Sequence, residues 1–169
     1  MDNIVLYHGR PTIVKEPIIK ATRFYKDFGW GFYCTNIKKQ AIRWAIDKNS
    51  NRFNNSDIPT TGILNAYEYI ENTTLKICKF ENMTDEWLDF ISECRNGYQH
   101  DYDIVEGAMA DDQIWDWVSD YLDGRINRKS FWDLVAFKYP THQISFHTPR
   151  ALQCLKFKEY REVSKDDIK

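Results

Sequence analysis

Residues 7–10, of sequence YHGR, combine groups that could bind a ligand carrying sugar hydroxyls and a flat amide. The imidazole of His8 can exchange a hydrogen bond with a sugar hydroxyl. Gly9 has no side chain, so a planar group can approach its backbone closely. The alternative interpretation is a histidine in a turn, with the glycine needed only for the turn geometry.

Residues 27–35, of sequence DFGWGFYCT, place two glycines one residue apart before a short aromatic strand and a helix. This spacing differs from the dinucleotide-binding pattern G-x-G-x-x-G, because no third glycine follows and the helix begins too late. Tyr33 on such a strand could stack its ring on a flat heteroaromatic ligand. Alternatively, the segment is an aromatic strand that only fills the core.

Residues 103–112, of sequence DIVEGAMADD, hold four carboxylates and lead into a predicted helix. Asp111 and Asp112 stand just before that helix, where negative charge stabilises the N-terminal end of the helix dipole. Capping is therefore one interpretation, and the other is that one of the two activates or positions an acceptor molecule. No His or Cys lies nearby and the spacing is not that of a calcium loop, so we predict no metal site.

The chain has 169 residues, of which 43% are hydrophobic and 15% aromatic, and this suits one domain with a sizeable core. We expect the domain over residues 1–163 and a solvated, disordered tail at 164–169. Strand and helix patterns follow one another without strict alternation. This indicates an α+β fold with a mixed or antiparallel sheet.

Charge and cysteine content narrow the functional classes. A net charge of −2 argues against a general nucleic-acid binder, although a nucleic acid could still be a chemical substrate. The four cysteines form no CxxC pair and no zinc spacing, so we expect reduced, buried thiols. Lacking a signal peptide or about 18 consecutive apolar residues, the chain is expected to be cytoplasmic, with no membrane partner. Delivery into another cell stays open.

The elements that must position these residues follow from local patterns. A helix over 36–48 should carry Trp44 on its apolar face. The segments 63–70 and 75–80 should form a hairpin around a polar turn. Further strands are expected at 4–7, 29–35, 103–110, 143–147 and 155–163, and further helices between Thr84 and Gly97 and at 113–122, 129–138 and 149–154.

The order of these motifs resembles the ADP-ribosyltransferase superfamily, and within it the His-Tyr-Glu branch of diphtheria-type toxins and poly(ADP-ribose) polymerases. Those enzymes carry His-Gly on an early strand and FGxGxY before a helix, as residues 8–9 and 28–33 do here. Over residues 5–157 the chain also resembles a bacterial family of unknown function in that superfamily. This second likeness rests on LYHG, DFGxGFYxT, QAxxWA, DIVxGxxADD and QISFHT.

The resemblance implies a split, strongly bent β core with flanking helices, and NAD in the cleft between the early strand and the helix after Tyr33. His8 would bond the adenosine ribose, and Gly9 would hold the nicotinamide carboxamide through its backbone. Tyr33 would stack on the nicotinamide ring, and Trp44 would lie across that ring. Thr35 joins them in the expected cofactor-binding set. For Trp44 the alternative is a residue of the helix core.

The third position of the triad departs from the family pattern, because Gln143 stands where a carboxylate is usual. A carboxylate bonds the ribose 2′-hydroxyl and stabilises an oxocarbenium-like centre by its charge. Glutamine keeps the hydrogen bond, loses the charge and cannot act as a general base. Losing one such contact commonly costs about 10²–10³ in rate. The alternative is a partly exposed strand residue with no role in a site.

The resemblance therefore predicts an NAD-dependent mono-ADP-ribosyltransferase that releases nicotinamide and modifies an unidentified protein or nucleic-acid acceptor. His8, Tyr33 and Gln143 would be its catalytic set, NAD its co-substrate, and no metal is expected. A bacterial toxin or effector would fit, with a cognate antitoxin or immunity protein as partner. The alternatives are a degenerate module that only binds NAD, ADP-ribose or a protein, and an NAD glycohydrolase that uses water as acceptor.

Overall fold

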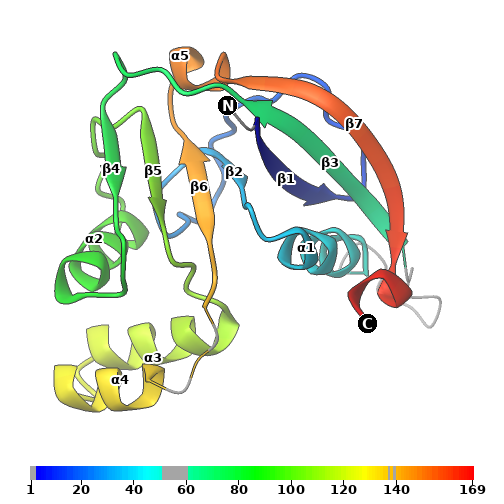
Figure 1. The fold of residues 1–169 in the computed structure, drawn as a ribbon. Coiled ribbons are helices and arrows are strands. Elements are labelled where there is room, and N and C mark those ends of the chain that lie inside the picture. Colours follow the sequence, from blue (N-terminus) through cyan, green and yellow to red (C-terminus); the bar gives the residue numbers. More distant parts are fainter. Residues whose placement is uncertain (1–2, 51–60, 137, 139) are drawn as a thin grey trace.

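The structure, a computed structural model, describes residues 3–50, 61–136, 138 and 140–169. Its strands form two sheets, one of three strands and one of four. Figure 1 shows the two sheets close together at the top of the view and diverging toward the bottom, with helices packed against them. The class is α+β, as predicted.

The three-stranded sheet has the order β1-β3-β7 and is antiparallel throughout. Its strands are β1 (Ile4–Arg10), β3 (Thr61–Tyr69) and β7 (Leu155–Ser164), and helix α1 (Lys38–Ser50) packs against it. His8 and Gly9 lie inside β1, whereas the sequence suggested that the strand ends before them. Pairing with β3 continues as far as Arg10, opposite Ile63, and this holds the segment extended.

Helix α1 approaches the first sheet very closely because glycines face it. A Cβ atom on Gly9 would lie 1.9 Å from the carbonyl oxygen of Ala41, and one on Gly62 would lie 2.5 Å from the backbone of Ala45. A larger residue at either position would push the helix off the sheet. The contacts fix α1 and therefore the place of Trp44, which lies on this helix.

The four-stranded sheet has the order β2-β6-β5-β4, in which the β4–β5 pair is parallel and the other pairs are antiparallel. Its strands are β2 (Phe32–Cys34), β4 (Ile77–Lys79), β5 (Ile104–Gly107) and β6 (Gln143–Phe146). Tyr33 pairs with Ser145, and Gln143 pairs with Gly107. β6 therefore lies between the strand that carries Tyr33 and the strand that leads to residues 111–112.

The hairpin predicted for residues 63–70 and 75–80 is wrong. β3 pairs with β1 on one edge and with β7 on the other, so both of its edges are taken, and β4 pairs with β5 in the second sheet. The polar turn is present, since the Thr74 N–H donates to Asn72 Oδ1 at 3.0 Å. This turn passes the chain from one sheet to the other, because a local turn signal does not specify the pairing partner.

The two sheets join where β1 meets the end of β2. The Tyr7 N–H donates to the carbonyl of Thr35 at 2.8 Å, and the Thr35 N–H donates to the carbonyl of Tyr7 at 2.9 Å. A buried cluster that includes Leu6, Phe32 and Tyr67 spans both sheets. The junction therefore has a shared core that couples β1 to β2.

Three helices, α2 (Asp85–Arg95), α3 (Asp112–Leu122) and α4 (Arg128–Val135), share a second core with the four-stranded sheet. Local signals set their ends. Thr84 caps α2 by accepting from the Trp87 N–H, and Gly97 beyond its C-terminus has a φ of +97°. Thr148 likewise caps the short helix α5, Pro149–Leu152, with proline in its first turn, as predicted.

At residues 164–169, where the sequence predicts a disordered tail, the structure describes local secondary structure. A single 3₁₀ turn, η1 (Lys165–Ile168), follows β7. The Ser164 N–H donates to Asp167 Oδ2 at 2.7 Å in a capping box, and Ile168 packs against the core beside α1. Polar groups at this end of the chain thus satisfy one another locally.

Candidate functional site

A cavity of about 170 Å³ lies where β2, α1 and β6 come together. Tyr33 from β2, the half-buried Trp44 from α1 and Gln143 from β6 all line it. The lining residues that were not candidate site residues are Lys26, Asp27, Arg95, Met109 and Ala110. The fold thus brings three of the expected site residues together from three separate segments.

Tyr33 is held rigidly at the cavity wall. Its hydroxyl donates to the carbonyl of Gly29 at 2.6 Å and accepts from the Phe28 N–H at 3.0 Å. Burial, and next the charge of Asp27, raise the pKa of Tyr33 well above its usual value, so the phenol stays protonated at neutral pH. Tyr33 can therefore offer a fixed ring to a ligand but is a poor acid or base.

Lys26 shares the cavity with this ring. Although the residue as a whole is exposed, its ammonium lies 4.9 Å from the centre of the Tyr33 ring, within the range of a cation–π contact. Removal from water, and next the charge of Arg10, lower the pKa of Lys26, while Asp27 opposes them. A ligand ring that stacks on Tyr33 would have to share this space with the ammonium.

Gln143 is buried, and the direction of its amide is set by its partners. Its Nε2 donates to Asp27 Oδ2 at 2.9 Å and to the carbonyl of Ala108 at 3.2 Å. Both partners accept only, so the NH₂ group must face them. The amide oxygen accepts no hydrogen bond from the part of the chain that the structure describes. Gln143 can thus accept a bond from a hydroxyl in the cavity.

Asp27 is the site residue that sequence reasoning missed. It is only 3% exposed. Its Oδ1 accepts from the Arg95 guanidinium, with Nε at 2.9 Å, and its Oδ2 accepts from the Ala110 N–H at 2.8 Å and from Gln143. Arg95 in turn lies over the ring of Trp115, 3.6 Å from its centre. The sequence signal for Asp27 was only a carboxylate just before the glycine motif. Its partners lie far along the chain, so no local pattern could reveal them.

His8 lies beside the cavity and is not among the residues that line it. Its Nδ1 is 2.6 Å from the carbonyl oxygen of Tyr33. Because a carbonyl only accepts, Nδ1 carries the proton of the neutral ring. The imidazole is 5% exposed and stacks on Phe32 with 4.2 Å between ring centroids. It is thus connected to the cavity through the backbone of β2.

Gly9 and Thr35 lie on either side of the junction between the sheets. Tyr7 exchanges both backbone hydrogen bonds with Thr35, so the backbone groups of Gly9, two residues further, point to the same edge of β1. The fully buried Thr35 hydroxyl accepts from the Ile37 N–H at 3.0 Å, at the start of α1. Thr35 therefore helps to begin the helix that carries Trp44.

The acidic residues before α3 have structural partners. Asp111 caps α3 by accepting from the Ile114 N–H at 2.9 Å, which confirms the capping interpretation for this residue. The side chain of Asp112 lies outside the described residues. Asp103 accepts from the Lys76 N–H at 2.9 Å and from the Thr148 hydroxyl at 2.6 Å, so it joins β4, β5 and α5.

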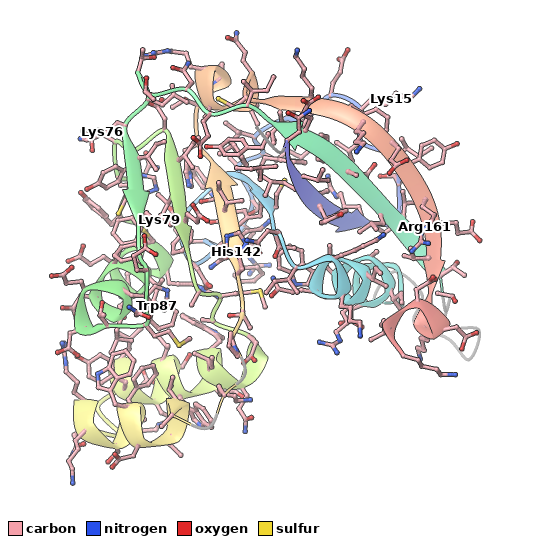
Figure 2. The ribbon with its side chains drawn as sticks, viewed as in Figure 1. Lys15, Lys76, Lys79, Trp87, His142 and Arg161 are labelled. Atoms are coloured by element: carbon pink, nitrogen blue, oxygen red, sulfur yellow. The ribbon has the colours of Figure 1, made fainter. Side chains whose placement is uncertain are left out.

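A second concavity, of about 660 Å³, lies between the ends of β4 and β5, helix α4 and residues 140–142. At its floor His142 Nε2 is 2.8 Å from Glu106 Oε1, and its Nδ1 accepts from the Asn36 N–H at 3.1 Å. This hydrogen bond lowers the pKa of Glu106. Figure 2 shows His142 where β6 begins, close to the chain that enters α1. Since neighbouring strand residues face opposite sides, His142 points away from the cavity that Gln143 lines.

Three further properties of the described ranges concern metal-binding groups, membrane-spanning helices and cysteines. Within them no group of three or more His, Cys, Asp or Glu side chains could hold a metal ion. The same residues contain no helix with the length and apolar character needed to cross a bilayer. The four cysteines are free thiols, of which Cys78 is partly exposed and the rest are buried.

Comparison with known proteins adds a family but no described relative. Neither the curated proteins nor the solved structures contain a match to this chain. A family model described as "Protein of unknown function (DUF3990)" matches residues 4–157, which is most of the chain. The family positions include β1, β2, β6 and the whole cavity lining. The chain therefore belongs to the DUF3990 family of proteins of unknown function.

Proposed function

We propose that this protein is an NAD-dependent mono-ADP-ribosyltransferase with an ADP-ribosyltransferase-like fold, and that the cavity of about 170 Å³ binds the nicotinamide end of NAD. One observation carries the proposal. Tyr33, Trp44 and Gln143, which the motif resemblance assigns to nicotinamide and its ribose, line one cavity although they come from three segments. The two diverging sheets with helices packed against them agree with the split, bent core that the resemblance implies.

The cavity size limits which part of NAD it can enclose. About 170 Å³ is smaller than the roughly 300–1,000 Å³ of pockets that enclose a drug-sized ligand. This suits one ring and part of a sugar but is too small for a dinucleotide. The adenosine half would then lie along β1, where His8 is found.

In the proposed reaction the bond between nicotinamide nitrogen and ribose C1′ breaks, and its electron pair leaves with nicotinamide. The rigid Tyr33 ring and Trp44 hold the leaving group, while the Gln143 amide oxygen accepts a hydrogen bond from the ribose 2′-hydroxyl. The acceptor nucleophile then attacks C1′ and releases its proton to water.

A degenerate NAD-binding module is the second candidate, and a specific observation favours it. The residue at the ribose position is the neutral Gln143, and the Lys26 ammonium lies against the Tyr33 ring. A positive group beside a nicotinamide that already carries positive charge disfavours binding until Lys26 moves. Neutrality at Gln143 also removes a source of transition-state stabilisation.

Labelled NAD distinguishes these candidates. We expect wild-type protein incubated with lysate to attach label to a macromolecule and to release nicotinamide. Free ADP-ribose without labelled macromolecule would instead identify a glycohydrolase, and binding without turnover would identify a module. Tyr33→Ala should abolish both the attachment of label and the release of nicotinamide. Tyr160→Ala, at a 51% exposed tyrosine of β7, is the matched control. Wild-type protein that neither binds nor consumes NAD would refute the proposal.

A further inference from the structure

We propose that Asp27 is a positioning residue that turns the Gln143 amide oxygen toward the ribose and supplies the negative charge that Gln143 lacks. The inference rests on the proposed function, since it assigns a role within the same cavity. It concerns a carboxylate that makes no contact with substrate in the proposed geometry. Asp27 would act only through its hydrogen bond to Gln143.

Asp27 decides which end of the Gln143 amide reaches the cavity. Its Oδ2 takes one N–H of Nε2 at 2.9 Å, and the carbonyl of Ala108 takes the other at 3.2 Å. A flipped amide would place its oxygen against two acceptor oxygens and lose both hydrogen bonds. The acceptor end is therefore directed away from Asp27, which is what a ribose hydroxyl requires.

Asp27 is itself held in one position. Arg95 binds its Oδ1 through two nitrogens, and the Ala110 N–H binds its Oδ2 at 2.8 Å. Arg95 is clamped over the ring of Trp115. A preorganised charge in a water-poor site acts more strongly than a mobile one. Arg95 offsets part of the negative charge of Asp27. It does so at Oδ1, however, whereas Gln143 binds Oδ2.

The charge reaches the cavity through the amide. A hydrogen bond from Nε2 to a carboxylate polarises the amide and makes its oxygen more negative. That oxygen would face the carbon that becomes positive when nicotinamide leaves. The carboxylate usual at this position of the branch would thus be replaced by a glutamine with a carboxylate directly behind it.

The hydrogen bonds around Gln143 predict how the variant Gln143→Glu behaves. The introduced carboxyl group would face two acceptor oxygens, from Asp27 and Ala108, at the positions where Nε2 now donates. It would hold a proton there and share it with Asp27, as paired carboxyl groups do. The protonated group has the shape of the native amide and, with its single proton, keeps the orienting hydrogen bond to Asp27 while losing the one to Ala108. Turnover at neutral pH should therefore match wild type, and it should rise at higher pH as the shared proton leaves.

A charge-exchange experiment tests the proposal in the full chain. Asp27→Asn should lower kcat for nicotinamide release by about 10²-fold. KM should change by less than about threefold, because asparagine keeps the size and shape of the aspartate at the cavity wall. The double variant Asp27→Asn with Gln143→Glu returns a carboxylate to the pair, and it should recover at least about tenfold of the lost kcat. Asp89→Asn is the matched control, because Asp89 pairs with Arg128 at 2.8 Å outside the cavity.

The outcomes separate this inference from the proposed function. Wild-type turnover with an unchanged kcat in Asp27→Asn, or with no recovery in the double variant, overturns the role of Asp27 alone. Absence of NAD binding and turnover in wild type overturns the proposed function. If the Asp27 variants do not fold, the pH dependence of turnover by Gln143→Glu tests the role of Asp27 instead. A rate above wild type that is constant from about pH 6 to 9 would exclude a shared proton.

Discussion

The Nδ1 atom of His8 lies 2.6 Å from the backbone carbonyl oxygen of Tyr33, so one buried hydrogen bond joins two residues of the expected catalytic set. The bond links β1 of the first sheet to β2 of the second. The His8 ring also stacks on Phe32, next to Tyr33 in the chain. The imidazole therefore fixes the place of Tyr33 at the cavity wall.

Replacing His8 with alanine should weaken both the fold and NAD binding. The Tyr33 carbonyl loses a buried donor, at a cost of about 1–3 kcal/mol in the free energy of unfolding. Loss of the anchor on β2 should lower NAD affinity by about tenfold, or about 1.4 kcal/mol. Urea denaturation and calorimetric titration measure the two effects. His8→Gln, whose amide can donate to the same carbonyl, should recover stability, and an unchanged stability of His8→Ala would contradict this account.

Replacing Trp44 with alanine should affect binding more than folding. The side chain is only half-buried and lines the cavity, so the loss of one stacking wall should lower NAD affinity by about tenfold. The free energy of unfolding should fall by about 1 kcal/mol or less. Trp44→Phe should keep most of the affinity. Trp132→Ala on α4, outside the cavity, is the control and should bind NAD as wild type does.

Replacing Gly9 with alanine should disturb the cavity indirectly, by displacing helix α1. The new Cβ atom would lie 1.9 Å from the Ala41 carbonyl, so α1 must move, at a cost of about 3 kcal/mol or more. Because α1 carries Trp44, NAD binding should weaken as well. Gly124→Ala has open space around its Cβ but a φ of +72°, and should cost only about 1 kcal/mol. Thermal or urea unfolding measures the loss in free energy of unfolding for each variant, and we expect the larger loss for Gly9→Ala. Equal losses in the two variants would show that the close contact between Gly9 and Ala41 does not hold α1 in place.

Acid should destabilise the protein through His147. Burial first, and the charge of His100 second, lower the pKa of His147 to about 4. The unfolded chain binds a proton near pH 6.5, so as the pH falls from 6.5 to 4 only the unfolded state becomes protonated. Stability that is fully present above pH 6.5 is therefore lost across this window, by about 3 kcal/mol.

Urea unfolding at a series of pH values tests this sign. The neutral His147 ring donates from Nδ1 to the carbonyl of Trp30 at 2.8 Å, a bond that an amide can imitate. His147→Gln should therefore have a flatter profile between pH 4 and 6.5 while matching the slope of wild type above pH 7. A wild-type stability that rises on acidification would have the wrong sign for a histidine with a lowered pKa.

The helix ends were largely predictable from the sequence. Thr84, Thr148 and Gly97 act through contacts within a few residues, and the structure places each at the expected helix end. The amphipathic pattern around Trp44 also correctly predicted α1, because helix periodicity is a property of neighbouring residues. The glycine motif directed attention to Tyr33 and the family resemblance to Gln143, and the structure brings both residues to one cavity.

Strand pairing and the charge in the site were decided only by the tertiary structure. β4 pairs with β5 and not with β3, and Asp27 meets Arg95 and Gln143 across long stretches of chain. A local pattern states which conformation a segment prefers and which face it buries. It does not state which distant segment will meet that face. The sequence by itself therefore determined where the helices lie and the Tyr33 motif, whereas the carboxylate behind Gln143 follows from long-range packing, because burying a charge requires partners that only the folded chain brings together.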